Sequence, residues 1–199
     1  AAEDRAGRAR SVGAELEYIR LRRPLTERLI HLFRKGMLPE RITHNDTKIN
    51  NVLFSETDGR ALCVVDLDTV MPGLVHYDFG DLVRTCVSSA PEDERDLSQI
   101  VVRGDYFESL LRGYLEAAGD VLTAEERRLL PFSGVLITLE TGIRFLTDYL
   151  EGDVYFQTHP PGHNLDRARA QLRLAERLEA LLPHMEEWLR HIEESRHLR

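Results

Sequence analysis

The fold is decided by the stretch His44-Asn-Asp-Thr-Lys-Ile-Asn-Asn-Val-Leu-Phe-Ser-Glu-Thr-Asp-Gly-Arg-Ala-Leu-Cys-Val-Val-Asp66. It holds two short apolar runs, 51–54 and 61–65, and the turn signal Thr57-Asp-Gly59 lies between them. Two apolar runs joined by a turn that contains glycine predict a β-hairpin. Because polar residues stand at both ends of this hairpin, we expect it to present side chains with a chemical role.

Apolar residues recur at helical spacing on both sides of the hairpin. The pattern predicts helices over 3–23, 25–35, 105–118 and 166–182, a long core helix after the capping box Thr123-x-x-Glu126, and a last helix that Pro183 opens. Proline has no amide hydrogen, so we expect Pro24 to separate the first two helices and Pro131 to divide or kink the core helix. The sequence therefore predicts an α+β domain that is mostly α, with one small hairpin between helices.

Length and charge narrow the class of protein. The 199 residues are enough for one domain with a sizeable core, and 26 Lys+Arg against 34 Asp+Glu give a net charge of -8, which repels a nucleic-acid backbone. Two cysteines, Cys63 and Cys86, are too few for a disulfide framework. No long apolar run or leader pattern stands out. We expect a cytoplasmic protein with free thiols that binds neither nucleic acid nor a membrane.

The loop before the hairpin has a spacing with chemical meaning. His44, Asp46 and Asn51 fit H-x-D-x-x-x-x-N, which is typical of the catalytic loop of protein-kinase-like phosphotransferases. In that loop the Asp orients the acceptor hydroxyl and the Asn holds magnesium, whereas we expect His44 to bond the backbone. Asp66 follows at the far end of the hairpin, so the three side chains can converge on one ion. Magnesium takes few protein carboxylates together with phosphate oxygens and water, which suits a site completed by ATP.

Other interpretations of the same residues stay open. Taken singly, Asp46 and Asp66 can be interpreted as ordinary turn and cap residues. Asn51 can likewise be a turn residue, and Lys48 an ordinary lysine exposed to solvent. The run Asp66-Leu-Asp-Thr69 after an apolar strand also resembles the nucleophile loop of haloacid-dehalogenase-like phosphatases. That family needs a phosphate-binding lysine later in the chain, and no lysine follows Lys48, which argues against the phosphatase.

The loop and hairpin, together with Val65-Asp-Leu-Asp-Thr-Val-Met-Pro-Gly-Leu-Val-His-Tyr-Asp-Phe-Gly-Asp-Leu-Val-Arg84, resemble the aminoglycoside/choline-kinase-like phosphotransferase superfamily. Within it, the likeness is closest to N-acetylhexosamine 1-kinases, which phosphorylate the anomeric hydroxyl of N-acetylglucosamine or N-acetylgalactosamine. The run 149–167 also resembles that subgroup. The resemblance implies a protein-kinase-like C-terminal lobe, ATP as phosphoryl donor, Mg²⁺ as cofactor and a small sugar as acceptor.

The same resemblance assigns roles to single residues. Asp46 would be the catalytic base, Lys48 would face the transferring phosphoryl group of ATP, and Asn51 and Asp66 would hold magnesium. Asp68, Thr69, Arg144, Tyr155 and Trp188 would bind the sugar, and Asp81 and Arg84 would brace the loop. The last three sugar residues have structural alternatives: Arg144 in an ion-pair ladder with Glu140 and Asp148, Tyr155 as a loop anchor and Trp188 in the core.

Kinase-like enzymes also carry an N-terminal β-lobe with a glycine-rich loop over the phosphates. Residues 1–43 instead have helical patterns and contain no G-x-G-x-x-G. We therefore expect residues 1–199 to form the catalytic and acceptor-binding lobe, without the nucleotide-binding β-lobe. The alternatives are an aminoglycoside- or choline-type kinase and a non-catalytic sugar-binding module.

Overall fold

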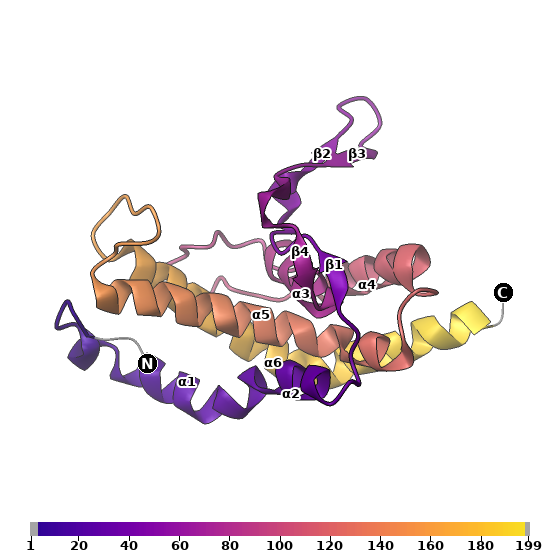
Figure 1. Ribbon diagram of the computed structural model, residues 1–199. Coiled ribbons are helices and arrows are strands. Elements are labelled where there is room, and N and C mark those ends of the chain that lie inside the picture. Colours follow the sequence, from indigo (N-terminus) through magenta and orange to yellow (C-terminus); the bar gives the residue numbers. More distant parts are fainter. Residues whose placement is uncertain (1–3, 198–199) are drawn as a thin grey trace.

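The computed structural model describes residues 4–197, and most of them lie in helices (Figure 1). The helices are α1 (Gly13–Thr26), α2 (Arg28–Arg34), α3 (Val75–Cys86), α4 (Gly104–Ala118), α5 (Ala124–Glu151) and α6 (His163–His197). The strands are β1 (Arg41–Thr43), β2 (Val52–Phe54), β3 (Ala61–Val64) and β4 (Met71–Gly73). This architecture confirms the predicted mostly α domain with a small β part.

The strands form two separate antiparallel pairs. β2 and β3 make the predicted hairpin, with Val52 opposite Val64 and an irregularity after Leu53. β1 pairs with β4 in the register Thr43 to Met71, a pairing that the sequence pattern did not predict. It brings the start of the catalytic-loop motif next to the segment that follows the hairpin. In Figure 1 the β1–β4 pair lies against α3, while the β2–β3 hairpin projects away from the helices.

Helix α5 is the centre of the core, with α6 and α3 packed along it. Its buried residues include Leu130, Leu139 and Leu146. The predicted capping box is present, since the Thr123 hydroxyl accepts the N–H of Glu126 and the Glu126 carboxylate accepts the N–H of Thr123. α5 is also long and apolar enough to cross a membrane, but 72% of its apolar stretch is buried inside the protein, as in a core helix.

The prolines do not break the helices where the sequence predicted. α5 continues through Pro131, and α6 runs as one helix through Pro183. α1 likewise passes Pro24 and ends at Thr26. Pro131 is itself buried between neighbouring helices. Most helical stability comes from packing of this kind, so it outweighs one lost backbone hydrogen bond.

Candidate active site

The catalytic loop is held by an acidic residue of α3. The Asp78 carboxylate accepts the backbone N–H groups of His44 (2.9 Å) and Asn45 (2.7 Å), and the Asp78 carbonyl accepts the Thr47 hydroxyl (2.6 Å). Burial raises the pKa of Asp78, while the two N–H bonds act in the opposite direction. Sequence reasoning missed Asp78, whose only local signal is its place as an acidic residue in the first turn of α3.

A second set of bonds ties this loop to the end of the hairpin. His44 Nε2 lies 3.1 Å from the Val65 carbonyl, and the Thr69 hydroxyl donates to the His44 carbonyl (2.6 Å). Asn45, in the left-handed region at φ 63°, donates from its side chain to the Thr69 carbonyl (3.1 Å). His44 therefore has the backbone-bonding place expected for it. The Thr69 hydroxyl, expected to point toward the sugar, donates to the loop in this structure, and Thr69 also lines the cleft described below.

Asp46, Lys48 and Asn51 form one hydrogen-bonded cluster. The Asp46 Oδ2 atom accepts Lys48 Nζ at 2.7 Å and Asn51 Nδ2 at 3.0 Å, and Asn51, 5% exposed, also donates to the Asp46 carbonyl. Burial favours a higher pKa for Asp46, but the bonds from Lys48 and Asn51 outweigh it and hold that pKa below its ordinary value. The same bond to Asp46 raises the pKa of Lys48. Asp46 is thus an ionised carboxylate with a fixed orientation.

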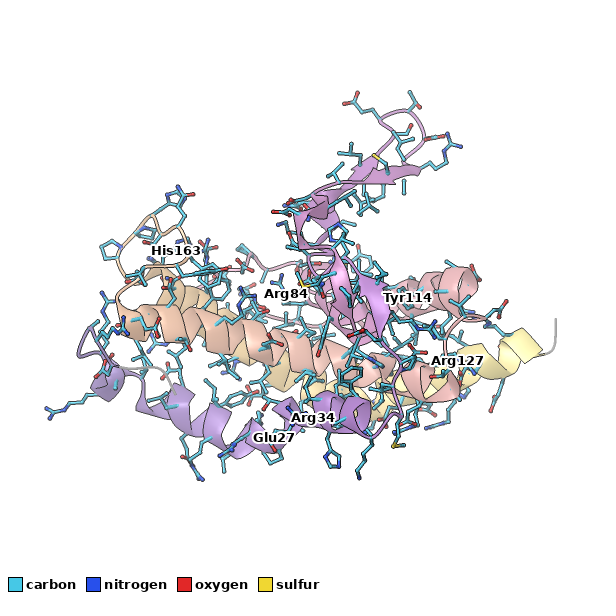
Figure 2. All side chains as sticks on the ribbon, viewed as in Figure 1. Glu27, Arg34, Arg84, Tyr114, Arg127 and His163 are labelled. Atoms are coloured by element: carbon cyan, nitrogen blue, oxygen red, sulfur yellow. The ribbon has the colours of Figure 1, made fainter. Side chains whose placement is uncertain are left out.

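A cleft of about 790 Å³ opens beside this cluster. Besides Asp46 and Lys48, its walls include Tyr77 and Arg84 from α3 and Glu140 and Arg144 from α5. In the view of Figure 2, Arg84 lies on the side of α5 from which the hairpin projects. The volume is within the range of small-molecule sites.

Arg84 is paired inside the protein. Its guanidinium contacts Asp81 at 2.8 Å and Glu92 at 2.8 Å, which links α3 to the segment 87–103. Burial favours a lower pKa for Arg84, but the two carboxylates outweigh it and the pKa is raised. These pairs tie Asp81 and Arg84 to each other and to Glu92, so their expected role as a brace of the catalytic loop stays a prediction.

Arg144 is different, because none of the described residues forms an ion pair with it. Its guanidinium lies over the rings of Phe156 (5.5 Å) and Tyr155 (6.0 Å), and the ladder with Glu140 and Asp148 does not form. Tyr155 is 73% exposed, and its ring meets that of Phe156 edge-on. The N–H donors of Arg144 are therefore free to hydrogen-bond to a molecule in the cleft.

A family model described as "Phosphotransferase enzyme family" matches residues 1–132. The chain belongs to this family. The match places it with the aminoglycoside/choline-kinase-like phosphotransferases and makes it a phosphotransferase of the kinase type. The matched range contains Asp46, Lys48, Asn51 and Asp66, whereas Arg144 lies beyond it.

The two residues predicted to hold magnesium, Asn51 and Asp66, lie at the base of the hairpin. Asp66 has a left-handed backbone (φ 64°), and its bond with the neighbouring Asp68 raises its pKa. Lys48 and Asp46 also act on Asp66 electrostatically. Within residues 4–197, no three His, Cys, Asp or Glu side chains gather into a metal site of their own. The amide of Asn51 and the carboxylate of Asp66 fit an ion that phosphate oxygens and water complete, as magnesium prefers.

Trp188 does not reach the cleft. Its indole packs against Phe107, with ring centroids 6.0 Å apart, and a Cβ on Gly104 would lie 2.7 Å from it. It belongs to the core between α4 and α6, so its expected place in the sugar pocket was wrong. The register of a long helix is hard to read near a proline, here Pro183, and this explains the error.

Proposed function

We propose that the protein transfers the γ-phosphoryl group of ATP to the anomeric hydroxyl of an N-acetylhexosamine. The observation that carries the proposal is the Asp46–Lys48–Asn51 cluster at the edge of the cleft. Phosphoryl transfer depends on positioning and on neutralisation of charge more than on covalent chemistry by the protein. A fixed carboxylate beside an ammonium group supplies both.

In this proposal Asp46 accepts the hydrogen bond of the anomeric hydroxyl and orients its oxygen toward the phosphorus. Lys48 offsets the negative charge that grows on the transferring group. Asn51 and Asp66 would hold Mg²⁺, which would supply neutralisation of the phosphate charge. The remaining Asp46 lone pairs take the proton as the oxygen–phosphorus bond forms and the bond to the leaving nucleotide breaks.

The far wall of the cleft supports a sugar acceptor. Arg144 has free donors for ring hydroxyls or an acetamido carbonyl, and Phe156 and Tyr155 offer aromatic faces beside it. Asp68 is exposed at the base of the hairpin and could bond a further hydroxyl. An aminoglycoside or choline would bring a cation toward Arg144, although Glu140 lines the same cleft and would attract it.

The exposed hairpin supports a second lobe in the complete kinase. Leu53, Phe54, Leu62 and Val64 are 47–57% exposed, and a two-stranded hairpin is seldom stable without a surface to pack on. We propose that a nucleotide-binding β-lobe covers this hairpin and that ATP lies between that lobe and Lys48.

Calorimetric titration with N-acetylglucosamine, N-acetylgalactosamine, an aminoglycoside and choline tests the acceptor. Release of ADP after sugar and Mg·ATP are added together tests the reaction. We expect sugar binding and sugar-dependent ADP release. Sugar binding without any Mg·ATP binding would make this chain a sugar-binding module, and preference for a cationic acceptor would overturn the sugar assignment.

A further inference from the structure

The most unusual buried charge outside the Asp46 cluster is Asp148, in the last turn of α5. Asp148 is 3% exposed, and among the described residues no Arg, Lys or His pairs with it. A carboxylate at this end of a helix also opposes the helix dipole. A buried charge is tolerated only when hydrogen bonds compensate it. The partners of Asp148 therefore indicate why it is there.

Those partners are mainly backbone amides of the next loop. The carboxylate accepts the N–H groups of three consecutive residues, Val154 (2.9 Å), Tyr155 (2.8 Å) and Phe156 (3.0 Å). The Asn164 side chain adds a fourth bond at 2.8 Å. One carboxylate thus fixes the first part of the loop 152–162 from inside.

The backbone of the loop is shaped for these bonds. Gly152 (φ 103°) and Asp153 (φ 61°) are both left-handed, and the Asp153 N–H returns to the Asp148 carbonyl at 2.8 Å. This helix ending turns the following amides back toward the Asp148 carboxylate. On the outer side, the Asp153 carboxylate contacts Arg8 (2.6 Å) and Asn164 (2.9 Å).

The third anchored residue belongs to the cleft. Phe156 lines it, and its ring packs on Phe145 with centroids 4.7 Å apart. The same ring also contacts the Arg144 guanidinium, at 5.5 Å. Since no described residue forms an ion pair with Arg144, the aromatic ring is what sets its direction. A shift of the Phe156 backbone would therefore move the free donors of the cleft wall.

We infer that Asp148 is a positioning residue for the acceptor, acting through the loop 152–162 on Phe156 and Arg144. The inference rests on the proposed function, because it takes the cleft as the acceptor site. The molecule positioned in this way is a neutral, hydroxylated acceptor that bonds the guanidinium and packs against the ring. Asp148 does not touch the acceptor, so its effect is on acceptor affinity and not on the transfer step.

The test compares two aspartates of the same loop by titration with N-acetylglucosamine and N-acetylgalactosamine. Asp148→Asn keeps the size but turns an amide donor toward the loop N–H groups, so we expect the acceptor Kd to rise about ten-fold. Asp153→Asn is the matched control, because it removes the outer ion pair and leaves the three amide anchors. We expect its Kd to stay within two-fold of the parent protein.

Two further measurements separate positioning from general damage. Amide hydrogen exchange should show lost protection at 154–156 in Asp148→Asn alone. In a Phe156→Ala background, Asp148→Asn should change the Kd by less than two-fold, because the ring through which Asp148 acts on Arg144 is no longer present. If Asp148→Asn does not fold, Asn164→Ala removes one of the four bonds and should raise the Kd about three-fold.

Each outcome has a defined meaning. Parent-like sugar affinity in Asp148→Asn with unprotected amides, or an undiminished effect in Phe156→Ala, overturns the inference. If the parent protein binds choline or an aminoglycoside in place of the sugar, the sugar assignment and the inferred neutral acceptor are both wrong. Parent-like protection of 154–156 in Asp148→Asn overturns the positioning role of Asp148 whichever acceptor binds. If the parent protein binds none of them, the proposed function and this inference fall together.

Discussion

The Asp78 carboxylate accepts the backbone N–H of Asn45 at 2.7 Å, one residue before the proposed catalytic base Asp46. The neighbouring N–H of His44 bonds to the other oxygen of the same carboxylate. The direction in which Asp46 leaves the backbone is therefore set by a residue of α3.

Asp78→Asn should lower kcat at least ten-fold. An amide in place of the carboxylate turns a donor toward one of the two N–H groups, which costs about 1–3 kcal/mol for a buried unsatisfied group. Thermal unfolding and steady-state kinetics measure the two effects. Glu108→Gln, an exposed change on α4, is the control and should alter neither. A parent-like kcat in Asp78→Asn would contradict the anchoring role.

Asp46→Asn should lower kcat by orders of magnitude while the sugar Kd changes little. The amide keeps the shape of the side chain but cannot take a proton, and it presents a weaker acceptor to the anomeric hydroxyl. Asp58→Asn, at the tip of the hairpin, is the matched control. Measured turnover close to that of the parent enzyme would remove Asp46 from the role of base.

The features of the fold and of the site that the sequence predicted correctly depend on residues that are close together in the chain. The β2–β3 hairpin follows from its turn residues, and the Thr123–Glu126 capping box follows from a three-residue spacing. The convergence of Asp46 with Asn51 likewise needed only the fixed spacing of a loop motif. Local geometry is encoded locally, so these features can be inferred before any packing is known.

The missed parts depend on contacts between distant segments. Asp78 and Asp148 act on backbone amides, which carry no side-chain signature in the sequence. Pro131 remains inside a helix because the surrounding core outweighs its local preference. Trp188 was misplaced because one aromatic residue in a long helix does not reveal which neighbour its face meets.

Glu126→Gln should destabilise the fold by about 2 kcal/mol, the scale of a hydrogen bond to a charged group. Glu126 is 1% exposed, and its carboxylate accepts two hydrogen bonds from the Arg41 guanidinium (3.0 and 2.9 Å) and one from the Thr123 N–H. The bonds from Arg41 join β1 to α5. Glu125→Gln removes an outer pair with Arg128 and should cost less than about 0.5 kcal/mol. Urea unfolding at pH 7 measures both variants, and equal losses would contradict the distinction.

The ion pair between Glu126 and Arg41 predicts that the stability of the fold depends on pH. Burial favours a higher pKa for Glu126, but Arg41 and Thr123 outweigh it and lower that pKa. The folded state therefore favours the ionised form, and the stabilisation is present above the unfolded pKa and lost as pH falls through the lower folded pKa. The stability difference between the parent protein and Glu126→Gln should shrink in acid.

His76 should make the fold less stable on mild acidification. It is fully buried, and Nε2 lies 3.0 Å from the Glu126 carbonyl, while Nδ1 has no hydrogen-bond partner among the described residues. Burial lowers the pKa of His76 although Glu126 and Glu125 act to raise it. Below about pH 6.5, the ordinary pKa of histidine, the unfolded chain binds a proton that the folded chain does not. Stability must then fall as pH decreases through this range.

Urea unfolding at pH 7 and pH 5 tests this, with His76→Gln as the variant. Glutamine can still donate to the Glu126 carbonyl but does not titrate, so the variant should lose less stability than the parent protein between the two pH values. His31→Gln, on the exposed side of α2, should keep the parent dependence. If all three proteins respond alike, the proton is taken up elsewhere and the buried imidazole does not control the acid response of the fold.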